Sequence, residues 1–182
     1  MSKLKEILTE AKEVLERVDE AAVTETAVLL AGGKRIFVVG EGRSGLMAKS
    51  FAMRMMHLGA TVYVIGETIT PSISPGDILV AVSGSGTTHG VVWTAQKARE
   101  LGAFVIALTT DDGSPLGRSA SRLLTIPAAT KHRREGERQS VQPLGSLFDQ
   151  CVHLVLDSVC LSFAELRGVD HAAAYKQHSN VE

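Results

Sequence analysis

The sequence predicts an α/β protein built around a parallel sheet of five strands. Five short apolar runs are each typical of a strand buried on both faces, and they occupy residues 35–40, 61–66, 77–82, 103–109 and 122–127. Helical stretches follow the first and third of these runs, over about 46–58 and from residue 88 to about 101. Strands that alternate with helices form right-handed βαβ units, and such units place the strands in parallel.

Further helices are predicted on both sides of this region. Apolar residues recur at helical spacing over about 2–18 and indicate an amphipathic helix. An alanine-rich helix over about 20–31 ends at the stop signal Gly32-Gly33. A long apolar helix over about 144–166 and a shorter one from about 169 complete the chain.

Length and composition narrow the class of protein. The chain has 182 residues, so we expect residues 1–182 to form a single domain with a full core. The net charge of −1, from 19 basic and 20 acidic residues, argues against a polybasic nucleic-acid binder. The apolar runs fall short of the ~18 residues that span a bilayer, so no membrane partner is expected either. The 17 glycines indicate tight turns or close approach of backbone to a ligand.

The two cysteines indicate the redox environment. Cys151 and Cys160 fall in one predicted helix, roughly 13 Å apart along its axis. A disulfide needs Cα atoms within about 7 Å, so both are expected to be buried free thiols. The N-terminal stretch also lacks the apolar core of a signal peptide. Together these features favour a reducing, cytoplasmic location.

Two loops rich in glycine and hydroxyl groups follow the first and third predicted strands: GEGRSG at 40–45 and SGSGTT at 83–88. Ligands of open parallel sheets bind beyond the carboxyl ends of the strands, where helices begin and present free N–H groups. The loops therefore predict a cradle for a phosphate monoester. The candidate substrate-binding residues are Gly42, Arg43, Ser44, Ser83, Gly84, Ser85, Gly86, Thr87 and Thr88.

Other interpretations of these loops stay open. GEGRSG fits the dinucleotide pattern G-x-G-x-x-G only in part, because its third glycine comes one position early. The loops could also serve only to turn the chain and cap helices. A P-loop is excluded, since no G-x-x-x-x-G-K-[ST] occurs. Glu41 would repel a bound phosphate, so its side chain is expected to point away from the anion.

Five stretches match a known pattern: GEGRSGLMAKSFAMRMMHLG (40–59), ITPSISPGD (69–77), SGSGTTHGVV (83–92), QPLGSLFDQ (142–150) and HSNVE (178–182). Through them the chain resembles the sugar isomerase (SIS) domain family, and within it the hexuloisomerase branch. The resemblance implies a three-layer α/β/α sandwich with flavodoxin-like strand order. It also implies interconversion of D-arabino-hex-3-ulose 6-phosphate and D-fructose 6-phosphate through an enediol, with no cofactor and no metal.

The resemblance further implies an assembly and a metabolic setting. A homotetramer with active sites between subunits is expected, with the helices at about 2–31 and 169–178 in the contacts. The reaction belongs to the ribulose monophosphate route, which fixes or detoxifies formaldehyde or supplies pentose phosphate. A hexulose-phosphate synthase would then be a functional partner.

Three candidate catalytic residues also come from the resemblance. The family motif G-S-L-F-E-Q places a glutamate at the start of the long helix, where this chain has the shorter Asp149. An enediol mechanism needs such a base to move a proton between adjacent carbons. His57 and His178 match histidines of the family pattern, and His178 would reach a neighbouring subunit's site. Simpler roles stay open: a first-turn acid for Asp149, a helix cap for His57 and a frayed terminal residue for His178.

Two alternatives to this function stay open. The departure at Asp149 leaves room for a weakened or non-catalytic sugar-phosphate binding protein, or for an isomerase of another sugar phosphate. The long polar segment 128–143, which mixes charges of both signs, is typical of a solvated face, although loops of this length also cover sites.

Overall fold

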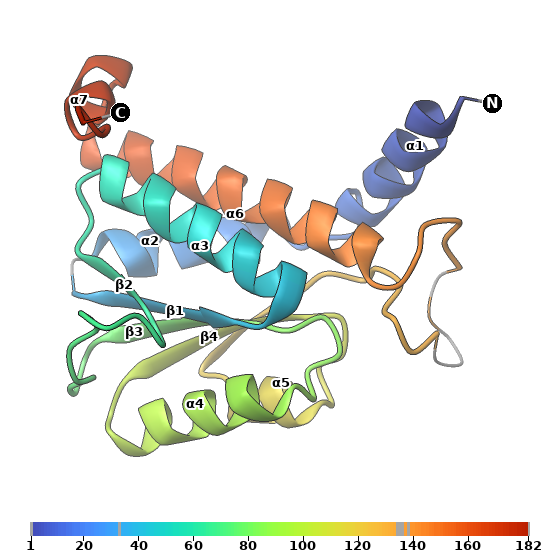
Figure 1. Ribbon diagram of the computed structural model, residues 1–182, viewed down its shortest axis with the longest axis horizontal. Helices are drawn as coiled ribbons and strands as arrows, with labels where there is room; N and C mark the ends of the chain where they lie inside the picture. Colours follow the sequence, from blue (N-terminus) through green and yellow to red (C-terminus); the bar gives the residue numbers. More distant parts are fainter. Residues whose placement is uncertain (1, 33, 134–136, 138, 182) are drawn as a thin grey trace.

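The computed structural model describes residues 2–32, 34–133, 137 and 139–181. Its centre is a five-stranded, all-parallel sheet with the strand order β2-β1-β3-β4-β5 (Figure 1). The strands are β1 (Ile36–Gly40), β2 (Val62–Val64), β3 (Ile78–Val82), β4 (Phe104–Thr109) and β5 (Arg122–Thr125). The predicted parallel sheet and its flavodoxin-like order are confirmed.

Helices cover both faces of the sheet. They are α1 (Lys3–Leu15), α2 (Glu20–Ala31), α3 (Gly42–His57), α4 (His89–Glu100), α5 (Pro115–Ser119), α6 (Ser146–Arg167) and α7 (His171–Lys176). Helices α2, α3 and α6 lie on one face and α4 and α5 on the other (Figure 1). This is the predicted three-layer sandwich.

The central strands explain why the sheet is buried on both sides. Every residue of β3 is buried, and the residues of β1 and β3 alternate between the two hydrophobic clusters. Phe37 and Leu79 pack toward α4, whereas Val38 and Val80 pack toward α3 and α6. A run of apolar residues without polar alternation is what such two-sided burial requires.

Two elements differ from the sequence prediction. Helix α3 begins at Gly42 and not at residue 46, so most of the first glycine-rich loop forms the first turn of the helix. Helix α5 was not predicted, because five residues are too few to show helical periodicity. Its start is nonetheless typical, since the Ser114 side chain accepts from the Gly117 N–H and Pro115 stands in the first turn.

The long helix α6 is by length and composition apolar enough to cross a membrane, contrary to the expectation that no stretch would be. In the structure 56% of this apolar stretch is buried, and the inner face of α6 packs in the larger hydrophobic cluster. This is the situation of a core helix. Cys151 and Cys160 lie on that inner face as free thiols, as predicted, and burial raises their pKa values to about 11 and about 12.

The β1–α3 turn supplies a test of the fold. A Cβ added to Gly45 would lie 2.6 Å from the carbonyl oxygen of Gly40, so the strand and helix approach more closely than a side chain permits. We predict that Gly45→Ala lowers the free energy of unfolding by about 1–3 kcal/mol. Gly145→Ala is the matched control, since nothing lies within 4 Å of its added Cβ. Urea unfolding measures both, and equal stabilities would contradict the prediction.

Candidate active site

A cavity of about 320 Å³ opens at the carboxyl edge of the sheet, where the two predicted loops meet the start of α6. It is lined by Glu41, Gly42, Arg43, Ser44, Val82, Ser83, Gly84, Ser85, Thr88, Thr130, Lys131, Pro143, Leu144, Gly145, Ser146, Phe148 and Asp149. Seven of the nine predicted binding residues therefore share one cavity with the predicted base.

Three helices begin at this cavity, and their N-termini differ from all others in the described chain. Helices α1, α2, α5 and α7 each have a side chain that accepts a hydrogen bond from a first-turn N–H. Helices α3, α4 and α6 have no such side-chain cap. Uncapped N–H groups and the positive ends of three helix dipoles thus converge on one place. This is an environment that stabilises a bound anion.

Asp149 is fixed by the first turn of α3. The Ser44 hydroxyl donates to Asp149 Oδ1 at 2.9 Å, and Arg43 Nε lies 3.4 Å from Asp149 Oδ2. Arg43 Nη1 also donates to the Ser146 hydroxyl at 2.9 Å. The glycine-rich loop and the start of α6 are thereby tied together across the cavity.

Burial and hydrogen bonding act on Asp149 in opposite directions. Only 6% of the residue is exposed, and loss of water raises the pKa of its carboxyl group. The Ser44 hydrogen bond and the charge of Arg43 lower that pKa, but the net shift is upward. A carboxylate of raised pKa is a stronger base than an ordinary aspartate, as proton abstraction requires.

The second loop contributes hydroxyl groups held in pairs. Ser83 and Thr88 share a hydrogen bond of 2.9 Å, and the Thr87 hydroxyl donates to Ser85 at 3.0 Å. Gly84 lets the Phe148 ring pack closely, because an added Cβ would lie 2.9 Å from that ring.

Gly86 and Thr87 do not line the cavity. Gly86 has a φ of +62° and its N–H donates to the Ser83 carbonyl, so it shapes the turn. A Cβ at Gly86 would also overlap the side chain of Ser114. These two predicted binding residues therefore support the loop that carries the others.

Glu41 is among the residues that line the cavity, and its side chain extends to the first turn of α4, where a carboxylate oxygen lies beside Gly90. The uncapped start of α4 attracts this negative charge. An anion at this end of the cavity would lie beside a carboxylate, so the starts of α3 and α6 are more favourable for an anion than the start of α4.

His57 and His178 lie together but away from Asp149. Their rings stack with centroids 5.2 Å apart at the C-terminal end of α3, and His57 is buried. Ser44, which contacts Asp149, precedes His57 by thirteen residues of one helix, or roughly 20 Å. Figure 1 shows α7 beside the C-terminal ends of α3 and α6, whereas both helices begin at the cavity. Within one chain these histidines do not reach the predicted base.

Comparison with known proteins agrees with this architecture. A model of the SIS domain family matches residues 29–154. The chain belongs to the SIS domain family. A relative from Bacillus subtilis called 3-hexulose-6-phosphate isomerase is 38% identical over 97% of this chain and 96% of its own length. A relative of the same name from Mycobacterium gastri is 42% identical over 95% of this chain and 86% of its own.

A solved structure has the same fold as this SIS domain. It is a hypothetical protein from Methanococcus jannaschii, for which a molecular function of 3-hexulose-6-phosphate isomerase has been inferred. The TM-score is 0.85 at 28% identity, and all of both chains is covered.

Sequence reasoning missed part of the SIS domain's cavity wall. Thr130 and Lys131 follow β5, while Leu144 and Ser146 enter α6, and none of them stands in a glycine-rich loop. For the residues that enter α6, the sequence did offer a signal, because a helix that follows a parallel strand begins at the carboxyl edge of the sheet, where ligands bind. In the part of the chain that the structure describes, no three His, Cys, Asp or Glu side chains gather as metal ligands would.

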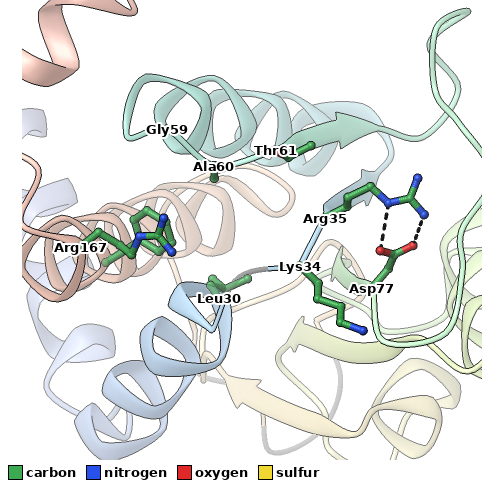
Figure 2. A pocket seen from close by; sticks show the side chains of 9 residues that line it. Leu30, Lys34, Arg35, Gly59, Ala60, Thr61, Asp77 and Arg167 are labelled. Atoms are coloured by element: carbon green, nitrogen blue, oxygen red, sulfur yellow. Dashed lines mark hydrogen bonds and ion pairs between the residues drawn. The ribbon is translucent and has the colours of Figure 1, made fainter.

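A second cavity, of about 350 Å³, lies at the opposite edge of the sheet (Figure 2). Arg35 and Asp77 form a two-bonded ion pair there, with Arg35 Nη2 2.5 Å from Asp77 Oδ2. Leu30 and Arg167 belong to the last turns of α2 and α6, and Gly59 follows α3. Helix C-termini carry negative dipole ends, so this cavity lacks the uncapped helix starts of the other edge, although Lys34, Arg35 and Arg167 line it.

The raised pKa of Asp149 predicts an effect on stability. Above that pKa the Asp149 carboxyl group is charged, and its buried surroundings disfavour the charge. Asp149→Asn removes the charge and therefore raises the free energy of unfolding. We expect the variant to melt at a higher Tm than the wild type at pH 7. This difference in Tm narrows as the pH falls through the raised pKa, because the Asp149 carboxyl group of the wild type then becomes neutral. Thermal unfolding from pH 4 to 7 measures this, and a difference independent of pH would contradict it.

Proposed function

We propose that the chain is an isomerase that interconverts D-arabino-hex-3-ulose 6-phosphate and D-fructose 6-phosphate. The observation that carries this is the cavity itself: three uncapped helix N-termini beside one buried carboxylate of raised pKa. The first feature fits the phosphate of a sugar, and the second fits a base. The activity that names the Bacillus subtilis and Mycobacterium gastri relatives requires both.

The chemistry follows from moving a carbonyl group by one carbon. Asp149 removes the proton from C2 of the hexulose, and the electron pair forms a C2–C3 double bond while the C3 oxygen gains a proton. The resulting enediol loses its O2 proton as the C2 carbonyl forms, and protonated Asp149 returns a proton to C3. The net change moves one hydrogen from C2 to C3 and one between the oxygens, so no oxidant is needed.

The oxygen that becomes negative during each step needs hydrogen-bond donors. Arg43 and the first-turn N–H groups of α3 and α6 face the same cavity as Asp149 and supply them. Ser44 has a second task, because its hydrogen bond holds the carboxylate in one orientation. The shorter aspartate side chain thus works from a fixed position, with the sugar brought closer to α6 than a glutamate would need.

His57 and His178 enter this proposal only through another subunit. We propose that a second copy brings its stacked pair toward the cavity, in a homotetramer with shared active sites, because the two histidines lie far from Asp149 within one chain. We further propose that the enzyme acts in the cytoplasm on the ribulose monophosphate route, next to a hexulose-phosphate synthase.

A coupled assay tests the activity. Purified protein is supplied with D-arabino-hex-3-ulose 6-phosphate, and formation of fructose 6-phosphate is followed. We expect turnover by the wild type, and a loss of about 10²–10⁴-fold in kcat for Asp149→Asn. Asp157→Asn is the matched control, because Asp157 is a half-exposed acid on the same helix. Absence of wild-type turnover while fructose 6-phosphate still binds would refute the enzyme proposal.

The pH profile tests the role of Ser44. The pKa of Asp149 is raised, so kcat/KM should fall on the acid side at a higher pH than an ordinary aspartate would give. The Ser44 hydrogen bond favours the charged carboxylate, so Ser44→Ala moves this acid limb to still higher pH. A profile of kcat/KM from pH 4 to 8 measures the shift. An acid limb at the same pH in both proteins would rule out Asp149 as the titrating base.

A further inference from the structure

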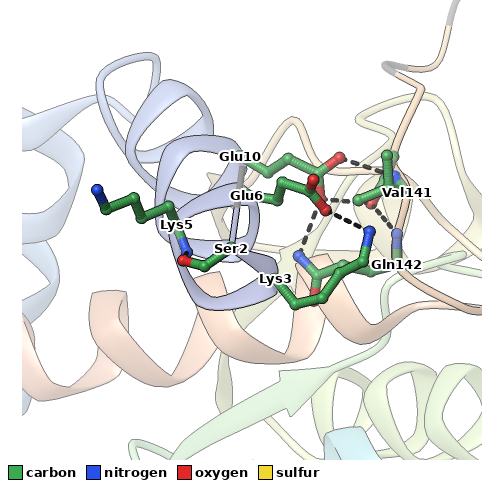
Figure 3. A network of polar contacts seen from close by, with 8 residues as sticks. Ser2, Lys3, Lys5, Glu6, Glu10, Val141 and Gln142 are labelled. Carbon is green, nitrogen blue, oxygen red and sulfur yellow. Dashed lines mark hydrogen bonds and ion pairs between the residues drawn. The ribbon is translucent and has the colours of Figure 1, made fainter.

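One carboxylate in α1 holds a segment that is distant in sequence and leads into the cavity (Figure 3). Glu10 Oε1 accepts from the Val141 N–H at 2.8 Å. Glu10 Oε2 accepts from the Ser140 hydroxyl at 2.8 Å and from Gln142 Nε2 at 2.9 Å. Three donors from consecutive residues thus converge on a single side chain.

The held segment continues directly into the cavity wall. Gln142 is buried, and its Oε1 accepts a hydrogen bond from Gln150 Nε2 at 2.7 Å. Gln150 directly follows Asp149, the proposed base, in the sequence. The following residues, Pro143 to Ser146, line the cavity. Leu144 adopts a φ of +53°, a conformation that a non-glycine residue keeps only when its surroundings impose it.

We propose that Glu10 is a positioning residue of the active site, which holds residues 140–142 so that the wall from Pro143 to Ser146 keeps its shape. The effect reaches the reacting groups through Ser146, whose hydroxyl accepts from Arg43, the residue that faces Asp149. Glu10 itself lies on α1 and is not among the described residues that line the cavity.

A carboxylate suits this task better than its amide. Its two oxygens accept from all three donors, and hydrogen bonds to a charged acceptor are stronger than neutral ones. A glutamine at position 10 would turn one acceptor into a donor that faces other donors. The geometry therefore predicts a graded series, with Glu10→Ala more harmful than Glu10→Gln.

The proposal is tested on the full chain by amide hydrogen exchange and by binding of fructose 6-phosphate. Glu10→Ala should exchange roughly 10-fold faster over residues 139–147, while residues 155–163 of α6 stay as protected as in the wild type. Fructose 6-phosphate should bind about 10-fold more weakly. Glu6→Gln is the matched control, because Glu6 lies one turn earlier on α1 and pairs with Lys3.

A kinetic readout separates positioning from a merely structural role. This readout and the binding of fructose 6-phosphate rest on the proposed function, whereas hydrogen exchange does not, so a failure of that function leaves the exchange test of Glu10 intact. We expect Glu10→Ala to lower kcat/KM by about 10- to 100-fold with the acid limb of the pH profile unmoved. Glu10→Gln should fall between it and the wild type. Wild-type exchange over 139–147, or equal losses in Glu6→Gln, would overturn the proposal.

Discussion

The parallel direction of all five strands forces the helices that follow them to begin at the carboxyl edge of the sheet and to end at the amino edge. Dipoles of α3, α4 and α6 therefore point the same way, with their positive ends at the cavity. The sequence leaves these three starts without side-chain caps and caps the remaining helices. A chain of almost zero net charge can hold a phosphate at such an edge, because the charge that matters is local and oriented.

In the proposed isomerase the same edge must also hold a base, and the two demands conflict. Helix N-termini and Arg43 stabilise the charged form of a carboxylate, which would make Asp149 a weak base. Burial opposes this and prevails, so the pKa of Asp149 lies above its ordinary value. The segment that enters α6 forms one part of the cavity wall, and α1 holds this segment from outside through Glu10.

The sequence was sufficient for the sheet, because continuous apolar runs identify strands buried on both faces. It was weaker at β2, which is an edge strand of three half-exposed residues within a longer apolar run. The glycine-rich loops located the cavity, but Thr130, Lys131 and Ser146 come from segments without a local pattern. Asp149 was found only through resemblance to a family motif. The separation of His57 from Asp149 depends on helix length and packing, which no motif contains.

Asp149 is the proposed group that exchanges a proton between C2 and C3 of a hexulose phosphate. The most direct measurement is isotope exchange: fructose 6-phosphate is incubated with the protein in D₂O, and its C–H signals are followed by NMR. We expect deuterium to enter at C3 with the wild type, and C3 to keep its hydrogen with the Asp149→Asn variant. Deuterium at C1, or exchange at C3 that proceeds equally fast in the variant, would contradict this role of Asp149.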